Sequence, residues 1–287
     1  MTNAAGPSVA VAIVTWNTSS AALAAAEAFA GSAGVRPEVT VIDNASDESE
    51  RDLLRNAGDS VRVRLEERNL GYAAAANLAL SDARTDAVCV TNADVKPHAD
   101  MLRTLTDAVL ADERIGIAAP NLGERGNAYH RRLPGASTLL VRAFLGSFGA
   151  AWAPGSLDGT PIEVDQPGGA CFVMRTALWR ELGGFDPGFF LWYEDVDLAK
   201  RAVDAGLRNV VMTSARAKHD EGAATARLDP VAHQAIRLRS LRRYVAKHHP
   251  RLLPAQRAAI STAAVFRGAH LRGWRGAREL LQGVRTG

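Results

Sequence analysis

The first two-thirds of this chain alternate short apolar runs, rich in β-branched residues, with longer segments of helical character. The runs predicted to be strands are Val9–Thr15, Val39–Ile42, Val61–Leu65, Ala87–Thr91 and Ile115–Ala118. The intervening segments predicted to be helices are Ser20–Ala30, Glu48–Ala57, Tyr72–Ala83 and Ala99–Leu110. Alternation of this kind favours a mainly parallel sheet covered by helices on both faces. We therefore predict an α/β protein.

The rest of the chain departs from this rhythm. Residues 120–168 are rich in Gly and Pro without a clear period, which is typical of a ligand-facing loop region or of an irregular connection. Further on we predict the strands Ala170–Met174 and Val210–Thr213, the helix Asp195–Ala205, and two Arg-rich amphipathic helices at Pro230–Lys247 and Pro254–Arg267. The predicted organisation is one domain over residues 1–225 and a basic helical extension over 226–287.

Composition narrows the class of protein. The 287 residues are 47% hydrophobic and 23% charged, as in an ordinary globular protein. The two cysteines, Cys89 and Cys171, lie in apolar runs and offer neither zinc spacing nor a disulfide framework. The sequence has no signal-peptide pattern at its start and no apolar stretch of the ~20 residues that a membrane span needs. We expect a cytoplasmic protein.

Charge is unevenly placed along the chain. The formal net charge is +3, but from Arg237 onward basic residues greatly outnumber acids. Such a tail favours contact with nucleic acid, an anionic membrane or an acidic partner, and it is equally typical of a solvated helical face.

Short polar side chains follow four successive predicted strands. These residues are Thr15 and Asn17, then Asp43, Asn44 and Ser46, then Asn69 with Asn77 in the next helix, and finally Asn92 and Asp94. Each one alone is typical of a helix cap or turn. In open α/β sheets, however, ligands bind where the carboxyl ends of the strands converge. Four such strand ends together predict a ligand site at that edge.

Three patterns in this set carry chemistry. The Asn92-Ala93-Asp94 turn offers oxygen ligands to a hard divalent cation that is shared with substrate phosphates. Glu194, Asp195 and Asp197 begin a helix directly after an aromatic run. They either complement the helix dipole or, because apolar neighbours raise carboxylate pKa values, include a general base. His219 follows the last predicted strand, where metal ligation is a reasonable use for it.

Taken together, these segments resemble glycosyltransferase family 2, and within it the bacterial rhamnosyltransferase-like enzymes. The motifs that carry the resemblance occur in the family's order over about residues 9–222: VAIVTWN, VIDNAS, NLGYAAAAN, TNAD, GGACFVMR, GGFDPGFFLWYEDVDLAKR and HDEG. The resemblance implies the GT-A fold, in which a Rossmann-like nucleotide-binding sheet is merged with an acceptor-binding part. It also implies an inverting enzyme that moves a sugar from a nucleoside diphosphate donor to an acceptor hydroxyl.

The resemblance assigns roles to individual residues. Asp94 is expected to be the principal ligand of Mn²⁺ or Mg²⁺ and His219 a further ligand, and an imidazole beside oxygen ligands favours Mn²⁺. Asn92 stands where many relatives have Asp, which removes one formal charge. Asp195 is the expected general base, and Glu194 orients the site. The expected nucleotide-sugar pocket comprises Thr15 and Asn17 near the nucleoside, Asp43 on the base, and Asn44, Ser46, Asn69, Gly71, Asn77, Asn92, Ala93, Gly169 and Trp192.

The substrates stay open at this point. L-Rhamnose from a dTDP donor is the leading expectation, and a UDP-sugar such as UDP-galactofuranose is the alternative. The acceptor is a glycan, a lipid-linked glycan or a small molecule. The basic extension is expected to pack on the catalytic part, to pair two subunits as a homodimer, or to contact the inner face of the membrane peripherally, whereas nucleic acid is not expected as a partner.

Two other functions compete with this one. A sugar nucleotidyltransferase normally carries a Gly-rich phosphate loop after its first strand, where this chain has Thr15-Trp16-Asn17-Thr18. A non-catalytic nucleotide- or nucleic-acid-binding protein would use the basic tail. The joint presence of Asp94, Asp195 and His219 disfavours that second alternative.

Overall fold

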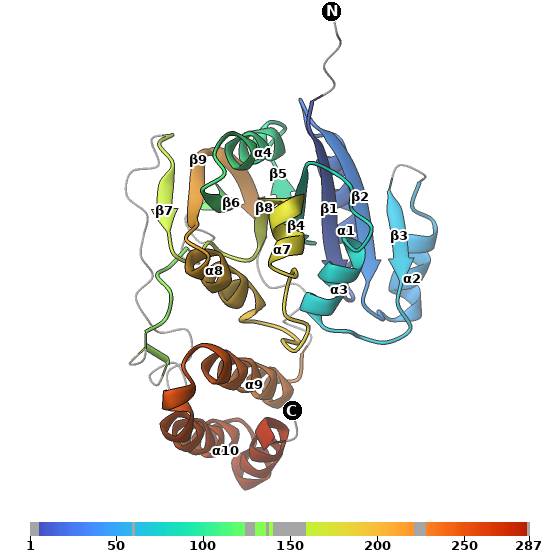
Figure 1. Ribbon diagram of the computed structural model, residues 1–287. Helices are drawn as coiled ribbons and strands as arrows, with labels where there is room; N and C mark the ends of the chain where they lie inside the picture. The colour runs from blue at the N-terminus through green and yellow to red at the C-terminus, as the bar shows by residue number, and fades with distance from the viewer. Residues whose placement is uncertain are drawn as a thin grey trace, which may run out of the picture.

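A computed structural model of the chain describes residues 6–58, 61–123, 130–135, 138–139, 159–220 and 228–285. Figure 1 shows a sheet flanked by helices, with a helical extension lying beyond one edge of the sheet. Most of the irregular segment 120–168 and the predicted domain boundary near residue 225 lie outside the described residues. The domain division therefore stays a prediction.

The elements follow the predicted alternation closely in the first half of the chain. Up to residue 121 they are β1 (Ser8–Thr15), α1 (Ser19–Ala30), β2 (Arg36–Asp43), α2 (Glu48–Arg55), β3 (Arg62–Leu65), α3 (Tyr72–Ala79), β4 (Ala87–Asn92), β5 (Val95–Pro97), α4 (Met101–Ala111) and β6 (Ile115–Asn121). Beyond it they are β7 (Ile162–Val164), β8 (Cys171–Arg175), α7 (Thr176–Glu181), α8 (Glu194–Asp204), β9 (Arg208–His219), α9 (Pro230–His248), a 3₁₀ turn η2 (Pro250–Leu252) and α10 (Leu253–Arg285).

Two elements are longer than the sequence pattern predicted. The strand expected over Val210–Thr213 runs on to His219. In this second half Ala215 and Ala217 are buried, whereas Ser214, Arg216 and Lys218 are exposed. Such alternation is typical of a strand, but alanine has little β propensity, so the sequence pattern did not predict this half of the strand. The helix expected over Pro254–Arg267 continues to Arg285 after a kink at Arg272 and Gly273.

The sheet is parallel on one side and mixed on the other. Its strand order is β3-β2-β1-β4-β8-β6-β9-β5, with β7 paired to β9. The first four of these strands are mutually parallel, as predicted. β8 then runs antiparallel to both β4 and β6, whereas β9 is parallel to β6. The carboxyl ends of β1, β2 and β4 consequently meet at one edge, which faces the helical extension (Figure 1).

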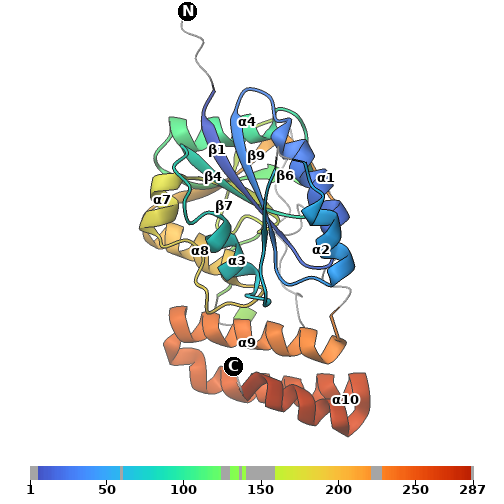
Figure 2. The ribbon, with the colours of Figure 1, turned by 90° about the vertical axis from the view of Figure 1, so that its right-hand side faces the viewer.

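Alternate side chains of the central strands point to opposite faces of the sheet and form two hydrophobic cores. On one face Val9, Val11 and Ile13 of β1 pack with α1 and α4, and on the other Ala10, Ala12 and Val14 pack with α3, α7 and α8. Figure 2 shows helices on both sides of the sheet. Each fully buried Val or Ile side chain stabilises the fold by about 1.5–3 kcal/mol, so this two-sided packing fixes where the strand ends lie.

The extension is joined to the rest of the chain by a third hydrophobic core, in which side chains of α9 pack with Ile260 and Leu280 of α10 and with Val196 of α8. It is fastened to α8 through the fully buried carboxylate of Asp197, which pairs with Arg201 in its own helix and with Lys247 and His248 of α9. In the described part of the chain, no helix is long and apolar enough to cross a membrane.

Candidate active site

A cavity of about 380 Å³ opens at the carboxyl edge of the sheet. Its walls come from the ends of β1 and β4, the loop that follows β2, the segment before α3, the segment before β8 and the entry to α8. The lining residues are Val14, Trp16, Thr18, Asn44, Asn69, Gly71, Tyr72, Asn92, Ala93, Asp94, Arg131, Gln166, Gly169, Ala170, Phe190, Leu191, Trp192, Glu194, Asp195, His219 and Leu228. Segments far apart in the sequence therefore share one pocket.

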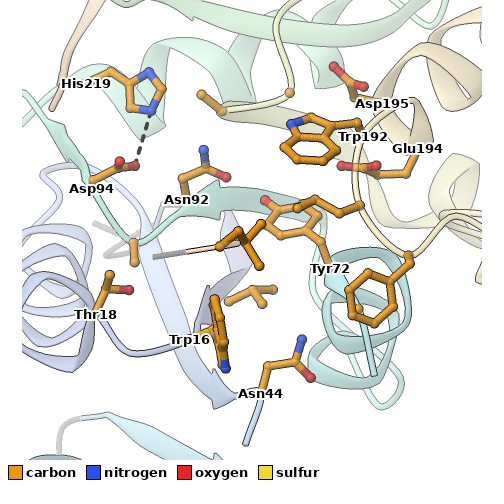
Figure 3. Close-up of a pocket in the computed structure, with 18 of the residues that line it drawn as sticks. Trp16, Thr18, Asn44, Tyr72, Asn92, Asp94, Trp192, Glu194, Asp195 and His219 are labelled. Carbon is orange, nitrogen blue, oxygen red and sulfur yellow. Dashed lines mark ion pairs between the residues drawn. The ribbon is translucent and has the colours of Figure 1, made fainter. Parts of the chain in front are cut away.

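On one side of this cavity, Asp94 and His219 form a close pair (Figure 3). Antiparallel pairing of β5 with β9 sets Val95 opposite His219, and this register brings the imidazole to the turn after β4. The His219 Nε2 atom lies 3.2 Å from the Asp94 Oδ1 atom, and both side chains are largely buried. The amide of Asn92 lies beside them in the same view. The pair presents one carboxylate and one imidazole to the cavity.

On the opposite side, Glu194 and Asp195 open helix α8 (Figure 3). The two residues before them, Trp192 and Tyr193, both have positive φ, at 65° and 70°. Non-glycine residues seldom adopt this conformation, and consecutive examples persist only where surrounding packing enforces them. Here Trp192 packs edge-on against His233, and Tyr193 lies against Tyr244 of α9. Packing against the extension thus helps to aim the start of α8 into the cavity.

The two carboxyl groups differ in their surroundings. Burial, together with the neighbouring Asp195 carboxylate, raises the pKa of Glu194 to about 8. Among the residues that the structure describes, the buried Glu194 Oε2 atom has no hydrogen-bond partner. Burial also raises the pKa of Asp195, but donors oppose this effect, namely the backbone N–H groups of Val196 and Gly169 and the side chain of Gln166. Of the two groups, Glu194 therefore holds its proton more tightly, because hydrogen-bond donors from other residues stabilise the charged form of Asp195.

The floor of the cavity is built by the segment that precedes α3. The Asn44 Oδ1 atom accepts a hydrogen bond from the Leu70 N–H group at 2.7 Å. Gly71 has φ +81°, and a Cβ atom there would stand 2.5 Å from the Phe190 carbonyl oxygen. The Tyr72 N–H group donates to that same oxygen at 2.7 Å. The glycine is thus required where two walls of the pocket meet.

Most of the predicted site residues line this cavity, including Asp94, His219, Glu194 and Asp195, whereas five lie outside its lining. Thr15 is buried and its hydroxyl bonds to that of Thr18 at 3.0 Å. The remaining four residues make hydrogen bonds within the protein. The Asn17 Oδ1 atom accepts from the Asp47 N–H group, and the Asn17 N–H group donates to Ser46 Oγ. The Asp43 carboxylate accepts from the Ser46 N–H group, and the Asn77 side-chain amide pairs with both the N–H and the carbonyl of Phe185. Their predicted contacts with a nucleotide stay predictions.

Several lining residues were not singled out by the sequence analysis. Trp16 and Tyr72 lie inside motifs that were quoted, so position relative to the strand ends was a usable signal for them. Arg131 and Gln166 come from the segment without a period, and they are joined there by an isolated β-bridge. No sequence pattern pointed to that bridge.

A comparison with family models identifies the family of the chain. The family model described as "Glycosyl transferase family 2" matches residues 10–160, which is more than half of the chain. The chain belongs to glycosyltransferase family 2. It is therefore a glycosyltransferase, as the resemblance of its motifs indicated.

The chain is also similar to a named enzyme of two bacterial strains. The N-acetylglucosaminyl-diphospho-decaprenol L-rhamnosyltransferase of two Mycobacterium tuberculosis strains is 29% identical over 231 residues, covering 74% of this chain and 75% of the relative.

Solved structures support the GT-A fold. The mannosyltransferase PcManGT from Pyrobaculum calidifontis, in complex with GDP-Man and Mn²⁺, superposes with a TM-score of 0.57 at 20% identity, over 99% of this chain and 77% of that one. GalNAc-T7 with UDP, GalNAc and Mn²⁺ superposes with a TM-score of 0.54 at 17% identity, over 83% of this chain and 48% of that one. At these identities the likeness concerns the fold.

Proposed function

We propose that this glycosyltransferase moves a sugar from a nucleoside diphosphate donor to an acceptor hydroxyl with inversion at the anomeric carbon. The single observation that carries the proposal is the cavity itself. The Asp94–His219 pair lies on one side of it and the Asp195 carboxylate on the other. One side can therefore bind the leaving diphosphate while the other accepts the proton of the attacking hydroxyl.

Asp94 and His219 are suited to hold a divalent cation. Two neighbouring ligands of one octahedral cation, each about 2.1 Å from it, stand about 3 Å apart, and the observed separation is 3.2 Å. Among the described residues no cluster of three or more His, Cys, Asp or Glu side chains is found, so the remaining positions would be filled by Asn92, water and substrate phosphates. When bound, the cation offsets the charge that develops on the leaving diphosphate.

Asp195 is the proposed general base. The acceptor hydroxyl donates its proton to the Asp195 carboxylate as its oxygen forms the new bond to the anomeric carbon and the bond to the diphosphate oxygen breaks. The hydrogen bonds from Gly169 and Gln166 fix the direction of the carboxylate. Protonated Glu194 has a hydrogen atom to donate to a sugar or acceptor oxygen, which is consistent with an orienting role.

For the substrates, the mycobacterial relative favours L-rhamnose as the sugar and a lipid-linked diphosphate glycan as the acceptor class. The dTDP-linked donor is our leading proposal, and a UDP-sugar is the alternative. A lipid-linked acceptor would place a cytoplasmic enzyme at the inner face of a membrane. Hydrophobic and aromatic lining residues such as Trp16, Phe190 and Trp192 are suited to stack on a nucleobase or sugar face.

The test begins with a panel of nucleotide sugars with and without Mn²⁺, scored by thermal shift and by donor hydrolysis. With the donor so identified, Asp195→Asn is expected to abolish transfer while leaving donor binding nearly unchanged. Near-normal turnover of this variant would show that the base is another group.

Asp94→Ala supplies the second half of the test. It is expected to weaken the titration of both metal and donor, whereas unchanged titrations would remove Asp94 from the cation site. If chelation stops neither hydrolysis nor transfer, the cation has no part in the reaction. Binding of nucleotide without any turnover would instead favour the non-catalytic alternative.

A further inference from the structure

Helix α10 is a hairpin with a sharp turn. The backbone leaves helical geometry at Arg272 and Gly273, where φ is −145° and +60°. Gly268 and Gly276 lie in backbone contact on either side of this turn, because a Cβ atom on either one would strike the backbone of the other. The two arms therefore pack closely against each other on either side of the turn. We call residues 266–278 the hairpin tip.

The hairpin tip exposes large apolar side chains. Phe266 is 69% exposed, Trp274 76% and Leu271 40%. Only three other large hydrophobic side chains in the described part of the chain are comparably exposed, and they lie apart from one another. They are Leu53 of α2, Leu110 of α4 and Phe190 in the cavity lining. Single exposed hydrophobics are ordinary, but two aromatics and a leucine gathered at one turn mark an interaction surface.

Charge identifies the kind of surface that fits. Residues 230–287 carry twelve Lys and Arg against a single acid, Glu279, whereas residues 1–229 carry 22 against 30 acids. Four of the arginines, Arg267, Arg272, Arg275 and Arg278, stand in the tip itself. The single acid Glu279 pairs with Arg272 and Arg275, so the tip keeps an excess of positive charge. Aromatic residues flanked by arginines are suited to the boundary of an anionic bilayer, where the rings enter the headgroup region and the cations meet the lipid phosphates.

The tip also lies close to the mouth of the cavity. Arg272 forms an ion pair with Asp229, the neighbour of the lining residue Leu228. One turn into α9, the ring of His233 packs 4.5 Å from that of Trp192, another lining residue. The buried pairs of Asp197 fasten the far end of α9 to the helix that carries Asp195. A surface held by the tip would therefore be held in a fixed relation to the cavity.

We propose that the hairpin tip docks on an anionic phospholipid surface, with Phe266, Leu271 and Trp274 inserted at the headgroup level. Docking there presents the cavity to acceptors carried by the same membrane, a consequence that rests on the proposed function. The lipid contact itself does not, because it depends only on the tip.

The experiment is vesicle flotation of the full chain with phosphatidylcholine alone and with added phosphatidylglycerol. Wild type is expected to float with the anionic vesicles only, and less so as salt rises. The double substitution Phe266→Ser with Trp274→Ser is expected to weaken binding at least about tenfold. Leu53→Ser with Leu110→Ser, which removes two exposed leucines of the sheet unit, is the matched control and is expected to bind as wild type.

A second readout locates the contact. Lipid-borne quenchers are expected to reduce tryptophan fluorescence in wild type but much less in Trp274→Ser. The proposal is overturned if wild type fails to bind anionic vesicles, or if the tip variants bind unchanged. It is also overturned if those variants instead split a dimer that shows no affinity for lipid. Transfer to a water-soluble acceptor reports separately on the proposed function, since it requires no membrane.

Discussion

Substitution of Gly169 by alanine is the sharpest way to disturb the proposed base without altering its chemistry. A Cβ atom at this position would lie 2.7 Å from the Asp195 Cβ atom and 2.8 Å from its Oδ2 atom. Carbon atoms in contact settle at about 3.5–4.0 Å. The two segments must therefore separate by about 1 Å, which also strains the hydrogen bond from the Gly169 N–H group.

A misplacement of about 1 Å can lower a catalytic rate about 100-fold, equivalent to about 2.7 kcal/mol in the barrier. We accordingly expect kcat of Gly169→Ala to fall about 100-fold, with the KM for the donor changed less than about threefold. Overpacking should also lower stability by about 1–3 kcal/mol. The assay is steady-state transfer, accompanied by thermal unfolding to show that the variant is folded.

Gly58→Ala is the matched control, because a Cβ atom there would meet no atom of the described residues within 4 Å. If Gly169→Ala is folded and retains kcat within about twofold of wild type, the contact with Asp195 does not set the rate. The assignment of Asp195 as the base would then lose its structural support.

Three further predictions concern other parts of the molecule. Because the raised pKa of Glu194 means that the folded state holds its proton more tightly, stability should fall as pH rises from about 4.5 through about 8, and Glu194→Gln should flatten that fall in thermal unfolding. Asp197→Asn leaves Lys247 and His248 without their buried partner and should lower the unfolding free energy by about 3 kcal/mol. The control is Asp204→Asn, which removes an exposed ion pair with Lys200 and should lower the unfolding free energy by less than about 1 kcal/mol. Asn92→Asp adds a charge beside Asp94 and should tighten Mn²⁺ binding, measured by calorimetry; unchanged affinity would place the cation elsewhere.

The sequence was most informative where hydrophobic pattern and strand ends coincide. Strands β1, β2, β3, β4 and β6 and helices α1 to α4 were predicted within a few residues, because apolar β-branched runs bounded by polar turns have few other uses. The three-residue strand β5 was not predicted. The turn at Asn92–Asp94 and the start of α8 also follow from sequence, since each stands directly at the end of a strand or an aromatic run.

What the sequence could not give is the pairing of distant segments. The contact between Asp94 and His219 depends on the short strand β5, only three residues long, and on the unpredicted second half of β9. The donation from Gln166 to Asp195 likewise depends on a bridge between two irregular segments. Local propensity carries no information about the register of distant segments. It also does not predict the contact between Gly268 and Gly276 that folds α10 back on itself.

The most direct test of the proposed active site is the position of the cation in crystals grown with Mn²⁺ and a nucleoside diphosphate. We predict an anomalous scattering peak within bonding distance of both the Asp94 carboxylate and the His219 Nε2 atom. The diphosphate should bind the same ion and face Asp195. A bound nucleotide with its Mn²⁺ away from Asp94 and His219, or a diphosphate outside this cavity, would contradict this prediction.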